Sequence, residues 1–197
     1  MQGLLTRIRR WLDAGRRLDF LGPLAFRIFL APIFILAGWS KLSGVTDTAS
    51  YFQFLGIPAP LLMAYVAGMT ELVGGILLVA GVAVRLVAIP LMVTMLVAAG
   101  SAHWDKGWHV LPEQQLTVPW EWREDLIEGA AERRAMARTL LRRHGNYDWL
   151  TETGSITILK NGIEFAATYF LMLLSLFFTG AGRLSVDHFV ARRVASG

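Results

Sequence analysis

Five charged side chains lie within or beside long apolar segments, and they are the first candidates for chemistry: Arg27, Lys41, Glu71, Arg85 and Glu164. An ionisable group at membrane depth carries a large free-energy cost, so it normally faces the interior of a helix bundle or a water-filled cavity. There it binds a ligand or forms a buried polar contact. No catalytic residue is identified by the sequence.

Glu71 is the most informative of these groups. It lies about ten residues beyond Leu61, roughly 15 Å along a helix, which is close to the middle of a bilayer. Ala64, Gly68 and Gly75 share its helical face, and small residues allow close approach of a second helix. The carboxyl is expected to be protonated, paired with a cation such as Arg27, or exposed to a polar cavity.

A second interpretation of the charged residues needs no ligand. Arg27 and Lys41 would then extend toward opposite membrane surfaces, with their aliphatic stems in the apolar region. Glu164 would cap the outer end of its helix. Glu71 is too deep for such an arrangement, so it is expected to function or to organise the bundle.

Two histidines, His103 and His109, are the candidate metal ligands. They are the first and last residues of the run His103-Trp104-Asp105-Lys106-Gly107-Trp108-His109. Imidazole and carboxylate groups can bind copper or zinc, although two histidines six residues apart in a loop are a weak signature. The chain has no cysteine, which excludes disulfides, thiolate metal sites and iron–sulfur clusters within it.

The elements that must position these residues are membrane helices. Hydrophobic residues make up 54% of the 197-residue chain and charged residues 17%, and the mean hydropathy is +0.47. A bilayer core needs about 20 apolar residues per helix. The predicted spans are residues 20–41, 61–84, 86–102 and 162–182. The fold class is therefore all-α, a polytopic membrane four-helix bundle in one domain, with an extracytoplasmic insert at 103–160.

The distribution of arginine predicts the orientation of the spans. The net charge of +4 arises at the two ends of the chain, which does not suggest a nucleic-acid partner. Basic residues concentrate on the cytoplasmic side of membrane proteins. We therefore expect cytoplasmic termini, a bacterial inner-membrane location and an uncleaved first span. The residues concerned are Arg7, Arg9, Arg10, Arg16, Arg17, Arg85, Arg183, Arg192 and Arg193.

The insert has two predicted parts. Residues 103–119 read as an irregular loop, and 120–144 as a helix that Gly145 ends. This helix is either solvated or lies on the membrane surface, or it binds a membrane or periplasmic protein partner. Homo-oligomerisation is a further possibility. Tryptophans in and around the insert are typical of a membrane interface: Trp39, Trp104, Trp108, Trp120, Trp122 and Trp149.

The first half of the sequence contains an ordered pattern: Arg27, Gly38 and Lys41, then Tyr51-Phe52 and Gly56-Ile57-Pro58, then Glu71, Gly74-Gly75, Leu78, Gly81 and Arg85. In this order the residues resemble the DoxX family of small four-helix membrane proteins. The long insert, ending in His144-Gly145-Asn146-Tyr147-Asp148-Trp149-Leu150, and the run from Asn161 to Tyr169 resemble the HvfX-type branch. Typical DoxX proteins have a much shorter third loop.

The resemblance implies a non-catalytic or accessory role in a complex. Some DoxX relatives are linked to quinone-coupled sulfur oxidation or to oxidative-stress defence, and HvfX-type proteins to the maturation of copper-binding modified peptides. The implied cofactors are therefore quinone or copper. The alternative is a small transporter or proton relay through the bundle, which Glu71 and the polar stripe of Asn161, Glu164, Thr168, Ser175 and Thr179 would suit.

Overall fold

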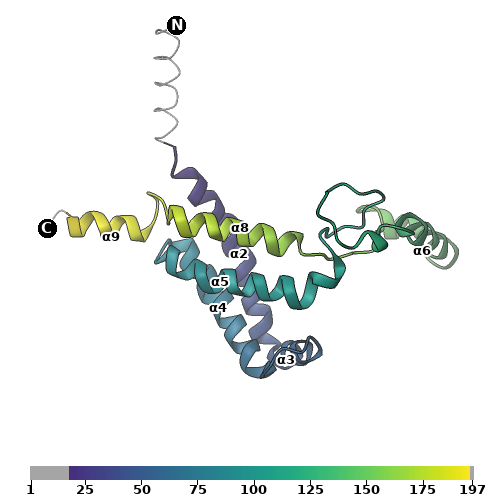
Figure 1. The fold of residues 1–197 in the computed structure, drawn as a ribbon, viewed down its shortest axis with the longest axis horizontal. Helices are drawn as coiled ribbons and strands as arrows, with labels where there is room; N and C mark the ends of the chain where they lie inside the picture. The colour runs from purple at the N-terminus through teal and green to yellow at the C-terminus, as the bar shows by residue number, and fades with distance from the viewer. Residues whose placement is uncertain (1–17, 196–197) are drawn as a thin grey trace, which may run out of the picture. The chain divides into compact units, whose positions relative to one another are not determined.

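A computed structural model describes residues 18–195, and this part of the chain is helical without any β-strand. The predicted all-α class is thus confirmed. The arginines of the predicted N-terminal orientation signal, Arg7 to Arg17, lie outside the described residues. Figure 1 shows the helices α2 (Leu21–Ser43), α3 (Val45–Phe54), α4 (Pro60–Ala80), α5 (Val84–Ala98), α6 (Ala130–His144), α7 (Tyr147–Thr151), α8 (Glu164–Thr179) and α9 (Val186–Ala195).

Within the described residues, three helical segments are long and apolar enough to cross a membrane: Leu21–Ser43, Pro60–Ala80 and Val84–Lys106. The third continues from α5 through a π-helical turn, Ala99–His103, and a 3-10 turn, Trp104–Lys106. The fourth predicted span is represented by α8, an apolar helix of 16 residues. At 1.5 Å per residue α8 is about 24 Å long, shorter than a bilayer core.

The chain divides into two compact units. Among the described residues, 18–95 and 169–195 form the first unit, and Leu96–Thr168 form the second. The first unit has one apolar core, to which four helices contribute: Phe34 from α2, Leu78 from α4, Leu91 from α5 and Leu173 from α8 are all buried. Packing of this kind holds helices together in a bilayer, where water does not drive their association.

Small residues bring α2 and α4 into close antiparallel contact. A side chain at Gly38 would collide with the backbone of Leu72, and one at Gly75 would lie 2.9 Å from the carbonyl oxygen of Ala31. The small face predicted from Gly68 and Gly75 is therefore the face that packs on α2. This crossing fixes which residues of the two helices can meet.

Several predicted boundaries were wrong. The turn after α4 is formed by residues 81–83, where Gly81 and Ala83 adopt positive φ, so the second helix ends at Ala80 and not at residue 84, and α5 begins at Val84 and not at residue 86. Helix α8 ends at Thr179 because Gly180 also has a positive φ of 77°. Helices α3 and α9 were not predicted; α3 is a short polar segment and α9 follows a glycine-rich turn.

The second unit differs from the predicted insert in its helix. The α-helix expected over 120–144 begins only at Ala130, after a 3-10 turn at Glu124–Leu126 and a left-handed Gly129. Gly145 follows its last residue, as predicted. Backbone hydrogen bonds then join two distant segments: Asn161 N donates to Val110 O and Gly162 N donates to His109 O.

Candidate functional site

A buried ion pair joins α2 to α4 in the first unit. Lys41 Nζ lies 2.6 Å from Glu71 Oε2. The Glu71 side chain is 5% exposed and that of Lys41 27% exposed, so the ammonium group is the accessible partner. The position follows from the helix crossing, because Gly38 lies one turn before Lys41 and Gly68 one turn before Glu71. Among residues 18–195, Lys41 is the one hydrogen-bond donor to this carboxylate.

This pair corrects two expectations. Glu71 is paired with a cation, but the cation is Lys41 and not Arg27, because α2 and α4 run antiparallel and Arg27 lies near the opposite end of α4. Lys41 also does not simply extend to a membrane surface; its ammonium group turns toward α4. Its place on the same α2 face as Gly38 was the sequence signal that could have identified it.

Arg27 is buried and saturates a cluster of backbone carbonyls. Its Nε donates to Leu78 O at 2.7 Å and its Nη2 to Val79 O at 2.7 Å, both in the last turn of α4. Its Nη1 donates to the carbonyl oxygens of Ala181 and Leu184, each at 2.8 Å. The final carbonyls of a helix lack intrahelical partners and carry partial negative charge. Arg27 therefore caps α4 and ties it to the segment after α8.

Arg85 and Asp187 extend this cluster at the turn between α4 and α5. Arg85 Nη2 donates to Phe178 O at 3.2 Å. The Asp187 carboxylate accepts from Ala83 N at 2.7 Å and from Val84 N at 3.2 Å, where the first amides of α5 need acceptors. Sequence reasoning missed Asp187, which reads as the one acid of a basic tail. These residues organise the structure around one end of the helices.

Glu164 and the two candidate metal ligands belong to the second unit. Glu164 opens α8, and its Oε2 accepts from Val110 N at 3.0 Å. His109 lies 2.8 Å from Glu113 and 3.6 Å from Glu164, while His103 Nδ1 lies 2.8 Å from Asn161 O. The two histidines thus contact different partners. Within residues 18–195, no group of three or more His, Cys, Asp or Glu residues is arranged to hold a metal ion.

A second buried ion pair, Glu121 with Lys160, was not predicted. The two side chains are 0% and 6% exposed, and Lys160 Nζ lies 2.5 Å from Glu121 Oε2. The same carboxylate accepts from Arg123 N at 2.9 Å and from Trp108 N at 3.2 Å. No periodic signal links these residues, because they lie 39 positions apart in irregular segments.

The surroundings of Glu121 change its acidity. Burial by itself would raise the pKa of this carboxyl. The hydrogen bonds from Lys160 and from the Arg123 and Trp108 amides stabilise the ionised form and outweigh burial, so the pKa lies below its ordinary value. All of these donors come from the second unit, and together they hold its irregular segments in place.

The two pairs differ in what they could do chemically. Glu121 is enclosed by donors and has little capacity for a ligand. The Lys41–Glu71 pair combines an accessible donor with a buried acceptor inside an apolar helix pair, which is an arrangement suited to a polar headgroup with a hydrophobic tail. It is the candidate functional site, and Arg27 and Arg85 support the helices that position it.

The family comparison covers helices α2 to α5. The sequence model of the DoxX family matches residues 22–104, which include Arg27, Lys41, Glu71 and Arg85. Putative oxidoreductase CatD of Bacillus subtilis (strain 168) is 36% identical over 76 residues, 39% of this chain and 55% of the relative. Inner membrane protein YphA of Escherichia coli (strain K12) is 35% identical over 98 residues, 49% and 69% respectively.

Inner membrane protein YqjF of Escherichia coli (strain K12) is 31% identical over 74 residues, 38% of this chain and 55% of the relative. The chain therefore spans about half the length of two of these relatives, and about two thirds of YphA. No solved structure matches it. Together with the apolar helices, these relatives indicate a bacterial inner-membrane protein.

Proposed function

We propose that this chain, which belongs to the DoxX family, is an accessory subunit of a membrane oxidoreductase system and binds a quinone headgroup at the Lys41–Glu71 pair. The observation that carries this proposal is the pair itself, an exposed-side donor and a buried acceptor 2.6 Å apart between two apolar helices. The name of CatD, a putative oxidoreductase, is consistent with a redox-linked role.

The residues present fit a quinone headgroup. Lys41 would donate to a quinone carbonyl, and Glu71 would accept from the hydroxyl of the reduced form. The isoprenoid tail would run from the pair to the exposed side of α4, where Tyr65, Met69 and Val73 lie; this side faces away from Glu71. A quinone carries electrons between enzymes. The electrons that reduce it here would come from a partner subunit.

The test is quinone content of the purified protein. The full chain would be extracted into lipid nanodiscs with its native membrane, and bound quinone measured by chromatography after solvent extraction. Lys41→Met and Glu71→Gln should each lower the quinone-to-protein ratio by about tenfold, the effect of losing one hydrogen bond to a buried partner.

The matched controls are Lys106→Met and Glu132→Gln, which change the same residue types in the second unit. They should leave the ratio unchanged. If the Lys41 and Glu71 variants fold and retain wild-type quinone, this site does not bind quinone.

We propose four spans with both termini in the cytoplasm. Arg85 at the start of α5 and Arg183, Arg192 and Arg193 after α8 support this orientation by the positive-inside rule. Helix α8 is short, but the fourth predicted span, residues 162–182, is mostly apolar over a longer stretch than the helix itself. Reporter fusions decide the topology: alkaline phosphatase should be active when fused after Gly154 and inactive when fused after Gly197.

The second candidate is a maturation factor for a copper-binding peptide, as in the HvfX-type branch. A hollow of about 230 Å³ in the second unit favours it, because its lining combines apolar and basic side chains: Leu126, Ala130, Ile158, Arg133, Arg134 and Lys160. Residues 120–144 would then dock the partner. Charge reversal of Arg133 and Arg134 should abolish crosslinking of the partner to Ile158, whereas reversal of Arg142 and Arg143 should not.

A transporter or proton relay through the bundle is the alternative. A relay through Glu71 would have to break its 2.6 Å contact with Lys41, and this counts against it. Proton flux into proteoliposomes that does not change in Glu71→Gln would remove the relay through this residue.

A further inference from the structure

Helix α9 begins at the end of two membrane helices. Asp187, its second residue, donates from its backbone N to Gly81 O at 3.1 Å and accepts through its carboxylate from Ala83 N and Val84 N. Residues 81–83 form the turn between α4 and α5, two helices apolar enough to cross a bilayer. Such a turn lies where the apolar core of the membrane ends. The first turn of α9 is therefore fixed at a membrane interface.

One face of α9 is apolar and exposed. Val186, Phe189, Val190 and Val194 follow i, i+3, i+4 and i+8 spacing, and each is between 44% and 77% exposed. Ala195 lies on the opposite side of the helix. An exposed apolar row of this kind marks a contact with another protein or with the membrane. Because the first turn of α9 is bound to the turn between two membrane helices, we expect lipid to contact this face.

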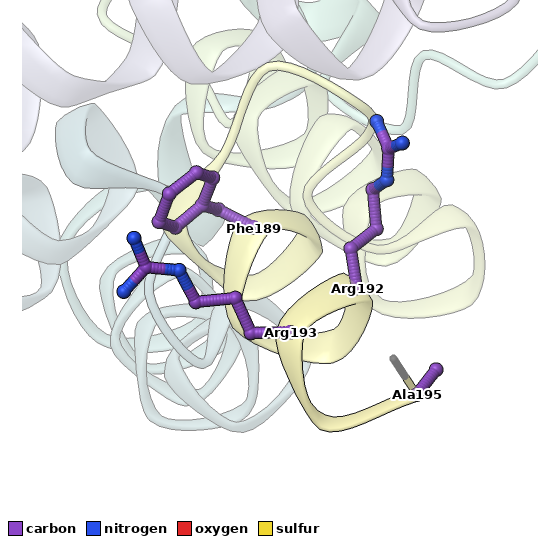
Figure 2. A pocket seen from close by; sticks show the side chains of 4 residues that line it. All are labelled: Phe189, Arg192, Arg193 and Ala195. Atoms are coloured by element: carbon purple, nitrogen blue, oxygen red, sulfur yellow. The ribbon is translucent and has the colours of Figure 1, made fainter. Parts of the chain in front are cut away.

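Two arginines accompany this face. By its spacing Arg193 lies within this face, with its guanidinium over the Phe189 ring and Cζ 4.5 Å from the centroid, whereas Arg192 lies about 100° further round the helix. Phe189, Arg192, Arg193 and Ala195 line an open hollow of about 400 Å³ (Figure 2). Figure 2 shows the two guanidinium groups extending from different sides of α9. Basic side chains with an apolar face are the composition of a helix that lies in a membrane interface.

We propose that α9 lies in the plane of the membrane interface, with its valine face in the lipid, and that Arg192 and Arg193 bind the phosphate groups of anionic phospholipids. The charge of the two arginines is complementary to an anionic surface, and the guanidinium group forms bidentate hydrogen bonds with phosphate. The hydrogen bonds of Asp187 hold the start of α9 at the depth where these contacts are possible.

The first arm of the test measures where α9 lies. The natural chain has no cysteine, so one introduced cysteine is the only labelling site. Val190→Cys and Ala195→Cys would each receive a spin label in the full chain, reconstituted in vesicles. The two positions are about 140° apart around the helix. The Val190 label should be accessible to oxygen in the bilayer, and the Ala195 label to a water-soluble nickel complex.

Either alternative result overturns the proposal. A Val190 label that only the nickel complex reaches shows an α9 in water. A Val190 label that neither reagent reaches shows a face covered by protein, either a second copy or a different partner.

The second arm measures lipid selectivity. A fluorophore at Val190→Cys is quenched by phospholipids brominated on their acyl chains, and the ratio of quenching by brominated phosphatidylglycerol and phosphatidylcholine gives the preference for anionic lipid. Arg192→Gln and Arg193→Gln should each lower this preference about fivefold, the effect of one basic residue at an anionic surface.

The matched controls are Arg142→Gln and Arg143→Gln, each of which removes one positive charge from α6 and should leave the preference unchanged. Added inorganic phosphate should also leave the preference unchanged if the ligand is the lipid surface. An equal preference in the Arg192 and Arg193 variants and in the natural chain contradicts the anionic-lipid part of the proposal.

Discussion

In residues 18–195, two lysine–glutamate pairs of almost equal length lie in very different surroundings. In the first unit, Lys41 Nζ lies 2.6 Å from Glu71 Oε2, and Lys41 is the one donor to Glu71 among the described residues. In the second unit, Lys160 Nζ lies 2.5 Å from Glu121 Oε2, and the amides of Trp108 and Arg123 donate to the same carboxylate. The distance within the ion pair therefore does not by itself distinguish a ligand-binding site from a contact that only stabilises the fold.

The difference lies in how much hydrogen-bonding capacity remains. A buried carboxylate surrounded by hydrogen-bond donors stabilises the fold, because its removal also leaves those donors without partners. An ion pair with few other hydrogen bonds, and with its lysine partly exposed, can replace its internal contact by a hydrogen bond to a ligand at a lower free-energy cost. We therefore expect a structural role for Glu121, in contrast to the binding role proposed for Glu71.

The largest effect should follow from replacing the enclosed pair. Glu121→Leu with Lys160→Met leaves the amides of Trp108 and Arg123 unpaired, which should cost roughly 2–6 kcal/mol of unfolding free energy at 1–3 kcal/mol per buried donor. Hydrogen-exchange mass spectrometry of the full chain measures this as faster exchange in residues 107–110 and 160–164. Exchange that stays at the wild-type rate would contradict the structural role.

An intermediate effect is expected from acid. Because the pKa of Glu121 is lowered on folding, the unfolded second unit binds more protons as the pH falls below about the ordinary value of 4.5. The stabilisation from Glu121 is thus complete above this pH and is lost as the pH falls through the lower pKa of the folded protein. After correction for the intrinsic pH dependence of amide exchange, the protection of residues 107–110 should fall on acidification in the natural chain.

The control for acid is Glu121→Gln, which keeps the shape and removes the titrating group. It should exchange faster than the natural chain at pH 7, and the gap between the two should narrow on acidification. A gap that is the same at both pH values would show that Glu121 does not titrate with folding.

The smallest effect on stability should follow from replacing the sparsely bonded pair. Lys41→Met with Glu71→Leu exchanges an ion pair for apolar side chains of similar volume, and such exchanges are often neutral or stabilising by about 1–4 kcal/mol. Thermal unfolding in detergent should therefore show no loss of stability, while bound quinone is lost. A strongly destabilised double variant would place Glu71 in the same class as Glu121.

Helical periodicity predicted the parts of the fold that lie in apolar helices. The face shared by Gly68, Glu71 and Gly75 follows from their spacing alone, and it is the face packed on α2. The partner of Glu71 did not follow, because periodicity places a residue on a face but does not give the register between two helices. That register is set by the contact of Gly38 with α4.

The second unit was less predictable for a related reason. Glu121 and Lys160 lie in segments without regular structure, so no repeat indicates that they meet. The start of the helix at Ala130 depends on Gly129, whose φ of 72° favours glycine. Asp187 was hidden by its basic neighbours, although its role at the start of α5 is that of a capping residue.

The hydrogen bonds of Arg27 have a consequence for how the protein is made. Two of its acceptors, Ala181 O and Leu184 O, lie 154 and 157 residues further along the chain. A ribosome that has delivered α2 and α4 to the membrane has supplied only the acceptors at Leu78 and Val79. Helix α2 therefore gains the full set of Arg27 hydrogen bonds only after the segment that follows α8 has been synthesised and has packed against it.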